Sequence, residues 1–352
     1  MQSTIIIYRL FDVAEEINLE LAQTLWLNRN KLASRLRFSR IHTKSMTFKD
    51  PPVIVELGSH EIELSGNIHL ANATAKIYDY GVISLNIAIQ LPEDITYEEY
   101  LDLAIASDSL PEKIIQDFVD GILSTIKAAC YKPSLSTFIE DFVVFYFEDE
   151  LPDWDLAQLL MKDKTKLNPQ SRQTVLENSF SYSDDLTYIT WESAIVFDPT
   201  GSRDIPDLLE FGSAQFLELR YYDNLLNEAI EVNYDEIEAL ETTKKGNHYY
   251  AYNQIRGRIM ERMGDASMLT SNIINSLQLT EDTFYAKVYT RYMQLQKTSI
   301  WRQSINQKLK VLQTSYNFLN EEVINHRKEI FGKIVLLILT CILLLQVYIA
   351  FL

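Results

Sequence analysis

Asp198 is the residue whose type and surroundings most directly suggest chemistry. It follows the apolar run from Ala194 to Phe197, and Thr200 and Gly201 come soon after it. Such a run predicts a strand, and an aspartate at the end of a strand can act as a nucleophile that accepts a phosphoryl group. The sequence therefore raises the hypothesis of a Mg²⁺-dependent phosphohydrolase that uses Asp198.

This motif resembles the nucleophile motif of the haloacid-dehalogenase-like phosphotransferases, but the rest of their catalytic set is not matched. Such an enzyme also needs a general acid, a lysine that balances phosphate charge, and further acids for the metal. Position 200 is Thr, where most such phosphatases carry a second Asp, and residues 205–330 read as helix rather than as further βα units. We therefore favour a simple strand-to-helix turn in which Asp204 caps the next helix.

Other motifs that carry chemistry are missing from the sequence. It contains no phosphate-binding glycine loop, no His-Glu-x-x-His and no paired Cys-x-x-Cys, and its five histidines are scattered. The acidic residues between Glu148 and Asp155 lack the ordered spacing of a calcium loop. We therefore expect no catalytic residue, no metal and no cofactor, and a protein that is not an enzyme.

Composition narrows the class of protein further. The chain has 352 residues, 47% of them hydrophobic, and a net charge of −17. This charge disfavours direct binding to nucleic acid, because phosphate binding needs a basic face. Two cysteines, Cys130 and Cys341, cannot build a disulfide framework, and we expect both to be inert packing thiols.

The final residues, 334–352, form the most informative stretch, "IVLLILTCILLLQVYIAFL". They contain no charge, Pro or Gly, and 19 helical residues span about 28 Å, which matches a hydrocarbon core of roughly 30 Å. The sequence predicts a transmembrane helix that serves as a tail anchor; the alternative is a buried core helix. We expect Gln346 to reach headgroups at the far interface or to hydrogen-bond across a helix pair.

Basic residues flank this span on its N-terminal side. Arg327, Lys328 and Lys333 stand there against one acid, Glu329. The positive-inside rule then places residues 1–333 in the cytoplasm or its organellar equivalent. The expected location is a bacterial inner membrane, or a mitochondrial inner membrane with the chain facing the matrix.

Residues 279–333 are predicted to form one long stalk helix. Thr280 is the expected cap, Glu281 and Asp282 suit the first turn, and no Pro or Gly follows until Gly332. Spacings of four and three residues define a coiled-coil-like seam of Ile305, Leu309, Leu312, Tyr316, Leu319 and Val323. The seam favours a homo-oligomer beside the membrane; the alternative is packing on this chain's own globular part.

Charge is segregated along the chain. From Glu281 to Lys333, nine Lys and Arg against five Asp and Glu give a net charge of +4, which leaves −21 for the remainder. An anionic leaflet attracts the basic stalk and repels the acidic remainder. We therefore expect the N-terminal part to project into the aqueous phase and to offer an acidic surface to a protein partner.

The N-terminal head, residues 1–203, is predicted to be α+β with a mixed or antiparallel sheet, followed by a helical subdomain at 204–278. Strands are expected in "TIIIYRLF", "PPVIVELG", "HEIELSG", "AKIYDYGVISLNIAIQL" and "SLSTFIEDFVVFYFEDE", with turns at Gly58 and Gly66. Helices are expected in "NLELAQTLWLN", capped by Asn18, and in "TYEEYLDLAIAS", "LPEKIIQDFVDGILSTIKAAC" and "DWDLAQLLM". Residues 173–199 read as a hairpin that turns near residues 183–185.

The layout of the chain resembles a family named for being required for meiotic nuclear division, which has fungal, bacterial and mitochondrial members. The matching stretches are residues 279–347, "IYDYGVISLNI" and "LPEKIIQDFVDGILSTIKAA". That family usually carries "LEW" where the span begins, and this chain has Glu329-Ile330-Phe331 instead. The resemblance implies a membrane-anchored, non-enzymatic protein with a poorly defined role, and it supplies no catalytic residue.

These observations lead to one main hypothesis and two alternatives. The main hypothesis is a tail-anchored membrane scaffold that presents an acidic domain to an unknown protein partner and self-associates through the stalk. The alternatives are a phosphohydrolase that uses Asp198, and an accessory subunit of a larger membrane complex.

Overall fold

The chain folds into two compact units, which are described separately. A computed structural model describes residues 2–29, 32–37, 46–242, 249–275, 277–279 and 284–350. The first unit comprises residues 1–221 and 270–301, and the second comprises residues 222–269 and 302–352. Two long helices, α6 (Asp204–Thr242) and α9 (Thr298–Ala350), contribute residues to both units.

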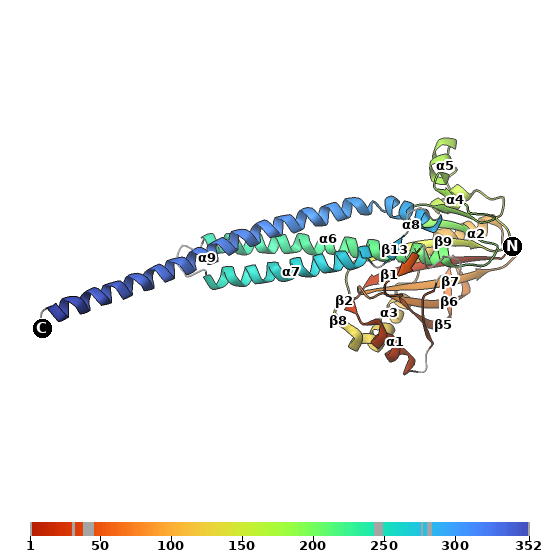
Figure 1. Cartoon of the computed structure of the whole chain (residues 1–352). Coiled ribbons are helices and arrows are strands. Elements are labelled where there is room, and N and C mark those ends of the chain that lie inside the picture. The colour runs from red at the N-terminus through yellow and green to blue at the C-terminus, as the bar shows by residue number, and fades with distance from the viewer. Residues whose placement is uncertain are drawn as a thin grey trace. The chain divides into compact units, whose positions relative to one another are not determined.

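A nine-stranded sheet forms the centre of the first unit (Figure 1). Its strand order is β10 (Ser179–Phe180), β11 (Leu186–Ile189), β12 (Ser193–Phe197), β9 (Ile139–Phe147), β1 (Ser3–Asp12), β7 (Val82–Leu91), β6 (Asn67–Ile77), β5 (Val53–Leu64) and β3 (Ala33–Arg35). Neighbouring strands are antiparallel except for β12 and β9, which are parallel. Two further pairs are β2 (Ala14–Ile17) with β8 (Cys130–Pro133), and β13 (Leu277–Leu279) with β4 (Met46–Phe48). The predicted α+β class with a mixed sheet is confirmed.

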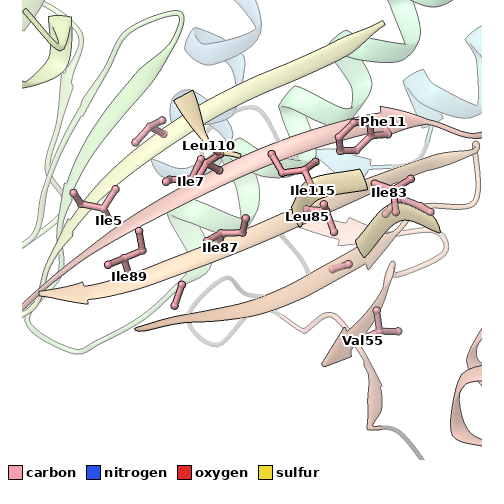
Figure 2. Close-up of a cluster of buried hydrophobic side chains, with 14 of the residues drawn as sticks. Ile5, Ile7, Phe11, Val55, Ile83, Leu85, Ile87, Ile89, Leu110 and Ile115 are labelled. Carbon is pink, nitrogen blue, oxygen red and sulfur yellow. The ribbon is translucent and has the colours of Figure 1, made fainter. Parts of the chain in front are cut away.

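One face of the sheet packs against helices from the N-terminal half. These are α1 (Leu19–Leu27), α2 (Tyr97–Ala106) and α3 (Glu112–Ile126). Successive side chains of a strand point to opposite faces, so Ile5 and Ile7 of β1 share this face with Ile115 of α3 and with Leu110 just before that helix (Figure 2). The shorter helical elements of this unit are the 3₁₀ turns Ser107–Ser109 and Lys127–Ala129, α4 (Leu156–Met161) and α5 (Pro169–Leu176).

The opposite face of the sheet packs against the first half of α6 and against α8 (Phe284–Leu295). Phe142 of β9 meets Tyr292 of α8 with ring centroids 5.2 Å apart. Ser213 of α6 lies 2.6 Å from the Tyr292 hydroxyl, oxygen to oxygen. Every residue of β1 is therefore buried, because helices cover the central strand from both sides.

Two glycines that were both expected to form turns have different roles. Gly66 forms the predicted turn with Ser65, and both have positive φ, as a two-residue hairpin loop requires. The prediction for Gly58 is wrong, because β5 runs through it and the ladder with β6 shifts register between Glu56 and Gly58. Gly58 therefore makes a β-bulge, which uses the same positive φ as a turn.

The predicted hairpin over residues 173–199 is shorter than expected. Residues 173–176 belong to α5, which starts at Pro169 and is capped by the Asn168 side chain on the Ser171 amide. A proline in the first helical position and an asparagine cap favour a helix here. Strands β10 and β11 then pair around the expected turn, and β11 pairs with β12.

The second unit is a bundle of three helices. It contains the second half of α6, most of α7 (Tyr249–Asn275) and α9 from Arg302 onward. The three helices lie side by side, with α7 antiparallel to the other two (Figure 1). Two contacts fix the direction of α7 relative to α9. Arg327 of α9 bonds Tyr249 at the start of α7, whereas Asn320, which comes earlier in α9, bonds Arg256, which comes later in α7.

The predicted stalk is not one helix, because α8 and α9 are separated at Gln296 and Lys297. Lys297 has φ 52°, a left-handed conformation that a helix does not contain. The side-chain Nε2 of Gln296 donates to the backbone carbonyl oxygen of Trp191 at 2.7 Å, which holds the break in place. The expected cap Thr280, with Glu281 and Asp282, lies outside the described residues.

Candidate functional site

The apolar stretch from residue 334 onward continues α9 without a break. Its side chains lie outside any core of the folded chain; Leu336 is 64% exposed and Leu344 is 68% exposed. Among the described residues, α9 is the one helix long and apolar enough to cross a membrane, judged by length and composition. This apolar stretch is therefore not a buried core helix.

The basic flank of this stretch lies on the exposed surface of α9. Arg327, Lys328 and Lys333 are all exposed, and so is Gln346 within the apolar stretch. The Lys333 ammonium lies 3.7 Å from a carboxylate oxygen of Glu329, one helical turn earlier. Such an exposed pair contributes little to stability, so these side chains are open to other charged groups.

The predicted seam faces the interior of the folded chain. Ile305, Leu312, Leu319 and Val323 are at most 1% exposed, and Leu309 and Tyr316 are half-buried. Figure 1 shows α9 lying along α6 and α7 over this range. The seam thus packs on the chain's own helices, which is the alternative that the sequence left open. Self-association through the stalk stays a prediction.

Polar contacts between the helices set the register of the bundle. Asp223 of α6 accepts a hydrogen bond from the Ser304 hydroxyl at 2.5 Å and forms an ion pair with Lys308 at 2.9 Å. Arg256 of α7 donates to the Asn320 side chain at 2.7 Å. Because each contact joins specific positions on two helices, sliding one helix along another would break them.

Asp198 lies where a strand turns into a helix. It follows β12, and its Oδ1 accepts the Thr200 amide at 2.9 Å and the Thr200 hydroxyl at 2.7 Å. Gly201 has φ 71° in the same turn, and α6 begins at Asp204. The carboxylate therefore stabilises its own turn, as Asx turns do.

A cluster of buried charges lies between the sheet and α6. The Lys76 ammonium on β6 is 2.6 Å from Asp207 and 2.6 Å from Glu210, both on α6. Burial alone would lower the pKa of Lys76, but the two carboxylates outweigh burial and raise it. Burial raises the pKa of Glu210 more than the Lys76 ammonium lowers it, and the nearby charge of Asp207 raises it further. Lys76 and Glu210 are sealed from solvent, so the cluster locks α6 onto the sheet rather than meeting a substrate.

A second group of buried acids lies further along α6. Glu218 is fully buried, and neither of its carboxylate oxygens has a hydrogen-bond partner among the described residues. Burial raises its pKa, and the nearby charges of Asp12 and Asp79 raise it further. Burial also raises the pKa of Asp12 to about 7 and that of Asp79 to about 6. The native fold therefore holds protons on acids that would be ionised in an unfolded chain at neutral pH.

This second group predicts that stability falls as pH rises. Between about pH 4 and pH 7 the folded chain binds protons that the unfolded chain releases, so the free energy of unfolding decreases across that window. Glu218→Gln is expected to be more stable than wild type at pH 8, similar at pH 5, and less dependent on pH. Thermal unfolding of the full chain in mild detergent would measure this, with the exposed Glu61→Gln as control. Parallel curves for Glu218→Gln and wild type would contradict the assignment.

Sequence reasoning missed Lys76, Glu210 and Glu218. A signal for the acids was present, because Glu210 lies in helical spacing with the apolar Ala214 and Leu217 of α6. An acid inside an apolar stripe indicates a buried charge that needs a partner. Identifying Lys76 as that partner required the tertiary fold, because 131 residues separate it from Asp207.

Comparison with known proteins places the chain in a family whose biochemical role is not assigned. The chain is similar to "Uncharacterized protein MJ0711" of Methanocaldococcus jannaschii, with 22% identity over 281 residues that cover 76% of this chain and 80% of that protein. No solved structure matches. The expectation of a family of unknown function is confirmed, whereas the comparisons give no support to the more specific resemblance to the family required for meiotic nuclear division.

The family match covers more than half of the chain. The family described as "Uncharacterized protein MJ0711, N-terminal domain" matches residues 2–203. This range contains all nine strands of the large sheet and ends one residue before α6 begins. The chain therefore belongs to the family of the MJ0711 N-terminal domain.

Proposed function

We propose that this protein is a non-enzymatic membrane scaffold, in which the apolar part of α9 crosses a bilayer and holds the family domain at the membrane surface. The observation that carries this proposal is the continuity of α9. One helix runs from the bundle into an apolar stretch that no described part of the chain covers. A stretch of this length matches a hydrocarbon core of roughly 30 Å.

Charge supports an orientation in this proposal. Arg327, Lys328 and Lys333 precede the span, and basic residues favour the cytoplasmic side. The acidic N-terminal part is repelled by an anionic leaflet. The family domain would thus project from the cytoplasmic face, in a bacterial inner membrane or on an equivalent organellar face, and offer its acidic surface to a protein partner.

Self-association and a place in a larger membrane complex are further parts of the proposal. Because Leu312 and Leu319 are buried in the chain's own bundle, pairing of copies through the seam would require helices to exchange between chains. Crosslinking of the full chain in membranes, followed by copurification in mild detergent, would identify either kind of assembly. A monomer without partners would remove both parts and leave the anchor.

The membrane anchor can be tested by placing charge in the span. We expect Leu339→Arg with Leu343→Arg to move the full chain from the membrane fraction to the soluble fraction, because each arginine at a helix centre costs about 3 kcal/mol of insertion free energy. The measurement is fractionation of cells followed by extraction at high salt and at alkaline pH. The matched control is Gln303→Arg with Gln307→Arg, which places the same charges at the same spacing on exposed positions of α9.

This fractionation distinguishes a chain that spans the membrane from a chain that is only bound to the membrane surface. Wild type and the control pair should resist both extractions. Release of the wild-type chain by alkaline extraction would contradict a spanning helix.

A phosphohydrolase is the rival proposal, and one observation favours it. The parallel pairing of β12 with β9 places Asp198 at the carboxyl end of a parallel strand, which is where many α/β enzymes bind ligands. Against it, the Asp198 carboxylate is bonded within its own turn. Mg²⁺-dependent phosphatase activity that is abolished by Asp198→Asn would make the rival the better account.

A further inference from the structure

The end of the bundle that lies nearest the apolar stretch carries a group of aromatic and basic side chains. Tyr249, the first residue of α7, stacks on His326 of α9 with ring centroids 5.3 Å apart. The Arg327 Nε donates to the Tyr249 hydroxyl at 3.0 Å, and its guanidinium lies 6.0 Å from the centre of the tyrosine ring. These contacts fix the start of α7 at a defined height along α9.

Tyr250 stands beside this contact and is turned outward. Its ring centroid is 5.5 Å from that of Tyr249, in an edge-to-face arrangement, and the residue is 73% exposed. A tyrosine has an apolar ring and a polar tip, so it is suited to a membrane–water interface, where one end is apolar and the other is wet. In water the same exposure of the ring is unfavourable.

The height of this group places it in the headgroup layer if the apolar stretch spans a bilayer. Seven residues separate Arg327 from Ile334, which corresponds to about 10 Å of helix. Phe331 lies between them and is 69% exposed, so the apolar surface begins about 6 Å beyond Arg327. The polar layer on each side of a hydrocarbon core is roughly 5–8 Å thick.

Exposed basic side chains lie at this height, with exposed acids among them. Arg327, Lys328 and Lys333 are exposed on α9 against one nearby exposed acid, Glu329. On α6, Glu238 is exposed near the end of the helix.

We propose that Tyr249, Tyr250, Arg327 and Lys328 form a collar that docks the bundle on anionic lipid headgroups. The occupant is a phospholipid surface because the collar is continuous with the span and combines interfacial aromatic rings with positive charge. Docking gives the chain a second attachment beside the span, and it holds the three helices upright on the leaflet. This inference rests on the proposed membrane anchor.

Depth-dependent quenching of fluorescence would test the collar in the full chain. Tyr250→Trp is compared with Tyr234→Trp. Tyr234 is also exposed, but it lies on α6, eight residues before that helix ends. Both variants are inserted into phosphatidylcholine vesicles with and without phosphatidylglycerol, which contain lipids that are spin-labelled on the headgroup. The signal of each new tryptophan is taken as the difference from the parent chain, which has four tryptophans.

The collar predicts that the headgroup label quenches Trp at position 250, and not Trp at position 234, in anionic vesicles. Arg327→Gln with Lys328→Gln should weaken docking by roughly thirtyfold, since each basic group near an anionic surface contributes about 1 kcal/mol, and quenching at position 250 should fall accordingly. Equal quenching at both positions, or quenching at 250 that ignores lipid charge, would overturn the proposal. Alkaline extraction of the same samples distinguishes this failure from failure of the anchor, because a spanning chain stays with the vesicles in every variant.

Discussion

Replacing Lys76 by methionine is expected to lower the free energy of unfolding by about 3–5 kcal/mol, the usual effect of removing one partner from a buried ion pair. The substitution keeps an unbranched side chain of similar length and removes the charge that Asp207 and Glu210 share at 2.6 Å. Both acids would then be left between the sheet and α6 without a cation. Thermal or urea unfolding of the full chain in mild detergent would measure the loss.

A matched control for Lys76→Met is Lys164→Met. Lys164 pairs with Asp102 on the surface, where its side chain is 64% exposed, and such pairs contribute about 0–1 kcal/mol. Adding Asp207→Asn and Glu210→Gln to Lys76→Met should restore much of the stability, because no buried charge remains. Equal effects of Lys76→Met and Lys164→Met would show that the buried cluster does not secure α6.

Replacing Leu312 by alanine is expected to destabilise the bundle by about 2–5 kcal/mol, the range for truncating a buried leucine. Leu312 is 1% exposed, whereas its neighbour Val311 is 37% exposed. Val311→Ala is therefore the control and should change stability by about 0.5 kcal/mol or less. Hydrogen exchange of α7 would locate the effect, because α7 packs beside α9 in this unit (Figure 1).

The dependence on protein concentration distinguishes the two environments proposed for the seam. A seam buried within one chain gives the same loss at every concentration of protein. A seam between copies would make the unfolding midpoint of wild type and variant depend on concentration, by mass action. That dependence would contradict the internal packing of Leu312.

The elements that the sequence predicts well are those with strong local signals. β1 reads as a β-branched run and folds as the central strand. Asn18 accepts a hydrogen bond from the amide of Leu21, as its position before an apolar helix predicts. The apolar stretch after Lys333 is helical, as its composition predicts, and the described part of the chain leaves it uncovered.

The elements that the sequence predicts poorly depend on tertiary contacts. A positive φ at Gly58 suits a turn or a bulge equally, and only pairing with β6 makes it a bulge. Lys297 shows no local sign of a left-handed conformation, which the bond from Gln296 to Trp191 maintains. The seam on α9 has the same spacing whether its partner is another copy or α6 and α7, so periodicity could not decide between them.

Accessibility of Cys341 tests the membrane anchor most directly. This thiol lies within the apolar stretch and is exposed in the folded chain, so only a surrounding bilayer or another protein would shield it. In a Cys130→Ser chain in intact membranes, we predict that a charged maleimide leaves Cys341 unlabelled, because a thiol within hydrocarbon does not form the reactive thiolate. The same reagent should label Cys341 once the membrane is dissolved and the chain is denatured. Rapid labelling of Cys341 by the charged reagent in intact membranes would contradict the spanning helix and the scaffold that depends on it.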